Sequence, residues 1–282
     1  MSDNKEADCL WGSDAVVILD RLLSPEECQS HVMALLHSED KHKSSTPHRE
    51  TESINLVRPA FSDEYEARLL PRLFSGPFKE ITITDSPEDI KSFGFGSAGR
   101  WRPCGVRPEW TIQSYQASTG HLNVHDDSTY IQDINKVTLV SLLIYLNEEF
   151  QEGETAFFER ADEDPEGAPV CVRKEKPQTG KAVLLRAQDV LRAGLPPIGG
   201  VKVILKTDVL FQRVSEPLDA ETTELIEEHA RVEQQLDCME VCSAETVQEV
   251  TRKLKSLYRR CPALESAGSL LTVSKPLTSA AV

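Results

Sequence analysis

The chain has 282 residues, with 46 acidic against 31 basic side chains, a formal net charge of −15 and a pI near 5.0. This acidic balance argues against nucleic acid and anionic membrane surfaces as partners, because both require clustered Lys and Arg. No apolar run reaches the roughly 20 residues that span a bilayer and the polar N-terminus lacks a secretory pattern, so we expect a cytoplasmic or nuclear protein that is not secreted.

The N-terminal third predicts one strand followed by two helices. Residues 14–23 (DAVVILDRLL) form an apolar run typical of a strand, and residues 24–27 (SPEE) carry a helix N-cap, a proline at the first helical position and a capping-box glutamate. A second helix is predicted over residues 62–75. Residues 38–52 are polar and are predicted as a loop, whereas residues 83–108 show no periodicity.

From Trp110 onward the sequence is rich in β-forming residues. Short apolar runs separated by polar turns occur at 110–115, 137–146, 182–185 and 201–211. This spacing is typical of a sandwich or barrel. The run at 137–146 (VTLVSLLIYL) is apolar on both faces, so we predict a buried central strand.

The C-terminal part has a helical pattern. One helix is expected after a cap at Asp219 or Thr222, and a second after a cap at Ser243, each with a narrow apolar stripe. We interpret them as an appendage that packs on the β domain, with a self-association surface as the alternative. Seven irregularly spaced cysteines favour reduced thiols over a disulfide framework.

One short pattern carries the chemistry. Residues 121–127 (HLNVHDD) contain His125-x-Asp127 at the predicted end of a strand. Because side-chain direction repeats every two residues along a strand, the imidazole and the carboxylate lie on the same side. They are two of the three ligands of the facial triad that holds non-haem Fe(II) and leaves positions open for a co-substrate and dioxygen. Without further context, this pattern often arises by chance.

The motifs around this pattern follow one another in a fixed order. They are Gly105-Val106-Arg107, the strand at 110–115, GHLNVHDD (120–127), LIYLN (143–147), EGETAF (152–157), GKAVLL (180–185), GLPP (194–197), GVK (200–202) and TDV (207–209). In order and spacing, residues 105–213 resemble the iron- and 2-oxoglutarate-dependent dioxygenases of the prolyl 4-hydroxylase-like class. Residues 22–28 match the opening of that family more loosely.

The resemblance implies a mostly β fold. Its core is a double-stranded β-helix, or jelly-roll, with N-terminal helices packed outside and a C-terminal helical appendage. We assign residues 1–104 to the N-terminal helical and strand support, 105–213 to the dioxygenase-like core, 214–261 to the appendage and 262–282 to a disordered tail.

The resemblance also implies an oxidoreductase. Fe(II), 2-oxoglutarate and dioxygen would hydroxylate an unactivated C–H bond, typically of a prolyl side chain in a protein substrate, with ascorbate as a supplementary cofactor. His125 and Asp127 match the first two iron ligands. Lys202 matches the basic residue that pairs with the distal carboxylate of 2-oxoglutarate, Tyr115 matches a residue that hydrogen-bonds the same co-substrate, and Thr155 is expected to shape the pocket.

The sequence departs from the family at the third iron ligand. The family has a histidine ten positions before the lysine that corresponds to Lys202, and this chain has Arg192 there. Gly194 and Pro196 keep the alignment in register. Arginine stays protonated and has no lone pair, so it cannot ligate iron. Replacement ligands would have to come from elsewhere in the chain, with His42, His48, Asp126 and Asp189 as candidates.

Two hypotheses therefore stay open. In the first, the chain is a working dioxygenase in which two protein ligands and chelating 2-oxoglutarate hold the metal. In the second, it is a catalytically impaired relative that acts as a binding or scaffolding module. Arg192 would then fill the place of the metal and form a salt bridge with Asp127.

Overall fold

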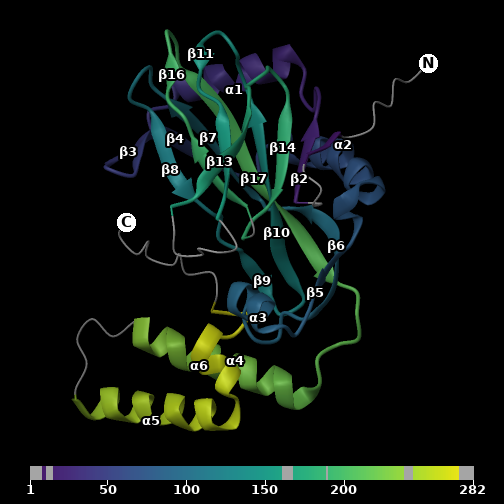
Figure 1. Cartoon of the computed structure of the whole chain (residues 1–282), viewed down its shortest axis with the longest axis vertical. Coiled ribbons are helices and arrows are strands. Elements are labelled where there is room, and N and C mark those ends of the chain that lie inside the picture. The colour runs from purple at the N-terminus through teal and green to yellow at the C-terminus, as the bar shows by residue number, and fades with distance from the viewer. Residues whose placement is uncertain (1–7, 11–14, 161–167, 189, 238–243, 273–282) are drawn as a thin grey trace. The chain divides into compact units, whose positions relative to one another are not determined.

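The computed structural model describes residues 8–10, 15–160, 168–188, 190–237 and 244–272 (Figure 1). The chain divides into two compact units. The first, called the β unit here, comprises Met1–Lys79, Pro103–Asp127 and Thr138–Leu210. The second, called the helical unit, comprises Glu80–Arg102, Ser128–Val137 and Phe211–Val282.

A curled antiparallel sheet forms the β unit. Its strands are, in spatial order, β1 (Asp8–Leu10), β2 (Val16–Leu19), β14 (Ala182–Arg186), β10 (Lys136–Tyr145), β17 (Lys202–Arg213), β7 (Glu109–Tyr115), β4 (Arg49–Val57), β8 (His121–His125), β15 (Leu191–Gly194), β12 (Thr155–Glu159) and β13 (Val170–Glu175). Strand β4 joins the two halves, because residues 52–57 pair with β7 and residues 49–50 pair with β8. The predicted mostly β, jelly-roll core is confirmed.

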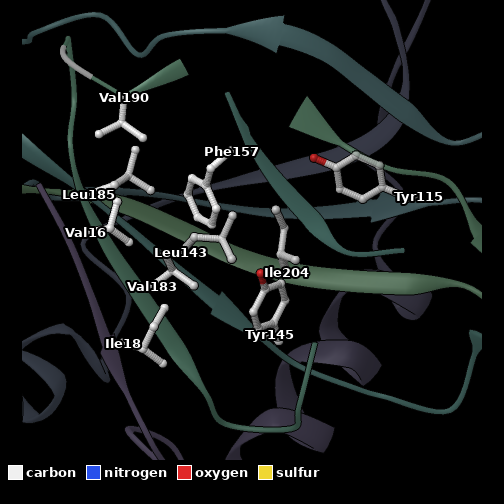
Figure 2. Close-up of a cluster of buried hydrophobic side chains, with 10 residues drawn as sticks. All are labelled: Val16, Ile18, Tyr115, Leu143, Tyr145, Phe157, Val183, Leu185, Val190 and Ile204. Atoms are coloured by element: carbon white, nitrogen blue, oxygen red, sulfur yellow. The ribbon is translucent and has the colours of Figure 1, made fainter. Parts of the chain in front are cut away.

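The core of the β unit is an apolar cluster contributed by strands far apart in the sequence. Figure 2 shows its members, which are Val16, Ile18, Tyr115, Leu143, Tyr145, Phe157, Val183, Leu185, Val190 and Ile204. Every residue of β10 after Lys136 is buried, so the predicted central strand is confirmed. Burial on both faces explains why this strand reads as one continuous apolar run.

Two helices, α1 (Pro25–His37) and α2 (Ser62–Ser75), pack against β7 outside this cluster, and the short helix η1 (Pro77–Lys79) follows α2. The capping box is confirmed, because the Ser24 hydroxyl accepts from the Glu27 N–H at 3.2 Å and the Glu27 carboxylate accepts from the Ser24 N–H at 2.7 Å. Glu27 also accepts from Arg68 of α2 at 2.9 and 2.5 Å. Tyr65 of α2 lies against Trp110 of β7, with ring centroids 6.0 Å apart.

The helical unit contains the predicted C-terminal helices. Its elements are β5 (Ile81–Ile83), the start of β6 (Gly99–Val106), β9 (Ile131–Asp133), α3 (Pro87–Phe93), α4 (Ala220–Asp237), α5 (Ala244–Arg260) and α6 (Pro262–Ala267). Asp219 caps α4 by accepting from the Thr222 N–H at 2.9 Å. The two longer helices share a cluster of Leu225, Val232, Val250 and Leu257. In the described part of the chain, no helix is long and apolar enough to cross a membrane.

Two expectations are corrected. Residues 38–52 are not a loop, because β3 (His42–Thr46) pairs with β4 in a hairpin. The side chains of β3 are largely exposed, so backbone pairing rather than apolar burial stabilises it, and apolar periodicity could not reveal it. Residues 262–267 form α6, so the predicted disordered tail does not begin at residue 262. Ser243 and residues 273–282 lie outside the described residues.

Candidate functional site

His125 and Asp127 lie together where β8 ends. The His125 Nδ1–H donates to the carbonyl of Asn123 at 2.8 Å, which leaves the lone pair on Nε2. This Nε2 lies 3.8 Å from Oδ1 of Asp127. The strand thus presents an imidazole lone pair and a carboxylate on one side, as the spacing predicts.

Arg192 stands directly opposite His125 in the antiparallel β8–β15 pair. Its Nη2 donates to both carboxylate oxygens of Asp127, at 2.7 and 2.5 Å. Arg192 is only 3% exposed, and its Nε has no hydrogen-bond partner within the described ranges. A buried guanidinium requires a compensating charge, and Asp127 supplies it. The carboxylate that would ligate a metal is therefore bound to an internal cation.

The charges around this pair set its protonation. Burial by itself would raise the pKa of Asp127, but the positive charges of Arg192 and Lys206 hold it well below its ordinary range. Burial, followed by the charge of Arg192, lowers the pKa of His125 to about 4. At neutral pH the site therefore holds an anionic Asp127, a neutral His125 and a cationic Arg192.

These donors do not fit Fe(II). The third ligand position holds a guanidinium, which offers no lone pair and repels a cation. No group of three or more His, Cys, Asp or Glu side chains that could hold a metal occurs among the residues described. The candidate replacements His42, His48 and Asp126 are exposed, and Asp189 lies outside the described residues. The metal-ligand roles of His125 and Asp127 stay predictions.

A small pocket beside the ion pair brings the remaining predicted residues together. Its polar lining consists of Tyr115, His125, Thr155, Arg192, Lys202 and Lys206. Thr155 accepts a hydrogen bond from the Tyr145 hydroxyl at 2.7 Å, so its hydroxyl is fixed in the pocket wall. The expectation that Thr155 shapes the pocket fits this placement.

Lys202 is held in the wall of the pocket. It is opposite Tyr115 in the β17–β7 pair, and its Nζ lies 4.1 Å from the centre of the Tyr115 ring. The ammonium also donates to the carbonyls of Gly153 and Leu195, each at 3.0 Å. Burial lowers the pKa of Lys202 to about 7 and raises that of Tyr115 to about 12. The Tyr115 hydroxyl is therefore a neutral hydrogen-bond group, and a bound anion would favour the charged form of Lys202.

Lys206 is a pocket residue that the sequence motifs did not single out. It lies four residues after Lys202 on the same face of β17, and it lines the same pocket. The sequence does contain a pattern that indicates this residue, because a second lysine interrupts an otherwise apolar strand (VKVILKTDV) at an even spacing from the first. One arginine and two lysine side chains therefore line a pocket in a chain whose net charge is −15. Chemically, this arrangement can bind and orient a small anion.

Comparisons with known proteins concern the fold. No family model and no curated protein matches the chain. Among solved structures, the viral collagen prolyl hydroxylase of Paramecium bursaria Chlorella virus-1 matches with 18% identity and a TM-score of 0.46, over 73% of this chain and 99% of that one. A Pseudomonas putida prolyl 4-hydroxylase matches with 16% identity and a TM-score of 0.47, over 72% and 94%.

A third match is the Trichoplax adhaerens prolyl hydroxylase in complex with a peptide fragment of the hypoxia inducible factor oxygen degradation domain. It has 14% identity and a TM-score of 0.45, over 76% of this chain and 88% of that chain. Other 2-oxoglutarate- and Fe(II)-dependent oxygenases also match. The chain thus resembles the 2-oxoglutarate-dependent dioxygenases of the prolyl hydroxylase class in its fold.

Proposed function

We propose that this chain is a domain of the 2-oxoglutarate dioxygenase type that acts as a metal-free binding module. The observation that supports this most strongly is the buried ion pair between Arg192 and Asp127, in which one guanidinium nitrogen donates to both carboxylate oxygens. A metal at this position would have to displace a cation that is 3% exposed and has no other carboxylate within ion-pair distance in the described part of the chain. The site is therefore complete without iron.

Iron-dependent hydroxylation of a protein substrate is the second candidate. One observation favours it, namely that His125, Tyr115, Thr155 and Lys202 all line a single pocket, as a working site requires. Binding of 2-oxoglutarate, dioxygen and ascorbate would belong to this candidate. When bound, Fe(II) would supply dioxygen activation, and the chain's own part would be to hold a carboxylate of the co-substrate with the Lys202 ammonium and the Tyr115 hydroxyl.

Turnover distinguishes the two candidates. Purified full-length protein is mixed anaerobically with Fe(II) and 2-oxoglutarate, examined for charge-transfer absorption, and then exposed to air while succinate is measured. The binding-module proposal predicts neither signal from the wild-type protein. It predicts both from Arg192→His, which restores the missing ligand, and neither from the matched control Arg192→Gln, which removes the cation without adding a ligand. Succinate formation by the wild-type protein above the level of Asp127→Asn would establish the second candidate.

A further inference from the structure

His121, at the start of β8, lies between two backbone carbonyl groups. Its Nδ1 is 2.8 Å from the carbonyl oxygen of Thr119 in the turn before β8, and its Nε2 is 3.3 Å from the carbonyl oxygen of Pro47 in the turn of the β3–β4 hairpin. A neutral imidazole has one N–H and donates to only one of these oxygens, whereas the imidazolium ion has two N–H groups and donates to both. The backbone around His121 is therefore arranged for the charged form of its ring.

The contact with the hairpin is the one that depends on this charge. The Nδ1 contact is the shorter of the two and joins residues that are two apart in the chain, so the single proton of a neutral ring stays on Nδ1. The lone pair of Nε2 then faces the Pro47 carbonyl, and two acceptors repel each other. Histidine side chains change charge between about pH 5 and pH 8, so the hairpin contact forms at the acidic end of this range and is lost at the basic end.

One acidic and two basic side chains lie on the hairpin side of His121. Glu50 of β4 is opposite His121 in the β4–β8 pair, and the two interact electrostatically. A glutamate is ionised above about pH 5, so Glu50 supplies a negative charge throughout the range in which a histidine titrates. Lys43 of β3 lies 3.5 Å from Glu50 and reduces the attraction that Glu50 exerts. Arg49 is one residue further along β4, where its Nε donates to Thr51 at 3.0 Å.

A second histidine at the same turn responds to pH in the opposite sense. The side-chain Nδ2 of Asn123 donates to Nδ1 of His48 at 3.3 Å, and this contact requires a neutral His48. The backbone N–H of Asn123 donates to the carbonyl of His48 at 2.9 Å, which makes this amide a direct reporter of hairpin docking. On the other side of β8, the residue of β15 in register with Leu122 is Gly194, which carries no charge.

The docked turn supports a narrow junction in the sheet. In the part of the chain that the structure describes, β4 pairs with β8 through residues 49 and 50 alone, and Leu122 and His125 of β8 line the pocket. We propose that His121 is a pH-dependent clasp, which docks the β3–β4 hairpin onto β8 when its ring is protonated and releases the hairpin when its ring is neutral. This inference goes beyond the proposed function and does not depend on it, because no metal or pocket ligand takes part in the clasp.

The backbone amide of Asn123 provides the test. Its solvent exchange is measured by NMR at about pH 5.5 and about pH 8, and the intrinsic rate at each pH divided by the observed rate gives a protection factor. We expect this factor to fall about 5- to 10-fold from the lower to the higher pH, the effect of losing one hydrogen bond at a half-exposed site. The protection factors of the buried strand β10 should change by less than about twofold, because global stability is not involved.

Three histidine variants assign this fall to one ring. His121→Gln keeps an amide N–H but does not titrate, so the protection of Asn123 should become independent of pH. His42→Gln replaces an exposed histidine of β3 in the same hairpin and should behave like the wild-type protein. His48→Gln removes the group that responds in the opposite sense, so the fall should persist or become steeper.

The ring of His121 in the wild-type protein gives a further check that needs no variant. Its nitrogen chemical shifts at about pH 8 should show the proton on Nδ1. A proton on Nε2 would overturn the inference, because the contact with the Pro47 carbonyl would then persist in the neutral ring. The inference is also overturned if the fall in Asn123 protection persists in His121→Gln, shown to be folded by near-ultraviolet circular dichroism, or disappears in folded His48→Gln.

Discussion

Asp127→Asn isolates the contribution of the buried ion pair. Asparagine keeps the shape of the side chain but removes its charge, so Arg192 stays buried at 3% exposure without a counter-charge. Removing one partner of a buried pair costs about 3–5 kcal/mol of unfolding free energy. With a shift of about 2–4 °C per kcal/mol for a chain of this size, the melting temperature should fall by roughly 6–20 °C. Thermal unfolding followed by near-ultraviolet circular dichroism measures this change, and urea unfolding gives the free energy.

A double variant and an exposed control make the test specific. Adding Arg192→Met to Asp127→Asn should recover part of the loss, because no orphaned charge remains in the interior. Lys253→Met breaks an exposed pair in which Nζ lies 3.1 Å from Glu249, and it should change stability by only about 0–1 kcal/mol. A loss below about 1 kcal/mol in Asp127→Asn, or strict additivity of the two substitutions, would refute the reasoning.

Three further predictions concern the β unit. Gly180 and Gly199 both have positive φ, +80° and +76°, but a Cβ at Gly180 would lie 2.1 Å from the Leu23 carbonyl oxygen, whereas a Cβ at Gly199 would meet nothing within 4 Å. Urea unfolding should therefore show that the free energy of unfolding falls by about 2–5 kcal/mol in Gly180→Ala and by about 1–2 kcal/mol in Gly199→Ala. Equal losses in the two variants would contradict a role for the contact with Leu23. Burial lowers the pKa of His31 in the folded protein below its value in the unfolded chain, which is about 6.5. The stability that this imidazole contributes is therefore complete above about pH 6.5 and is lost as the pH falls. His31→Gln should therefore flatten the dependence of unfolding free energy on pH between about pH 5 and 7, and an unchanged slope would exclude this residue as a cause. Ser24→Ala should cost about 1 kcal/mol through loss of the helix cap, measured by urea unfolding, and no loss would mean that the cap is dispensable.

Local signals account for the parts of the fold that were predicted correctly. The cap at Ser24 and the apolar run of β10 depend on chemistry within one segment, so the sequence alone reveals them. The β3–β4 hairpin depends on pairing of backbone groups between exposed polar segments, which leaves no apolar period to detect. The same holds for β4 as the link between the two halves of the sheet, since two partners distant in sequence define it.

The candidate site likewise contains residues that the sequence reveals and residues that only the folded structure reveals. Motif spacing placed Arg192 at the missing ligand position, and the structure places it opposite His125 and against Asp127. Lys206 matches no motif of the family, so the resemblance does not point to it, although alternation along β17 puts it on the same face as Lys202. Gln113 is 0% exposed and its side-chain amide has no hydrogen-bond partner among the residues that the structure describes, which could not be foreseen, because burial without a partner is a property of the packed interior.

Metal affinity tests the central claim most directly. Mn(II), a redox-stable substitute for Fe(II), is titrated calorimetrically into the wild-type chain, Arg192→His and Arg192→Gln. Our account predicts no saturable binding by the wild-type protein or by Arg192→Gln, and one site per chain in Arg192→His. One Mn(II) site in the wild-type protein that is weakened by Asp127→Asn would show that the ion pair opens for a metal, and it would contradict the account.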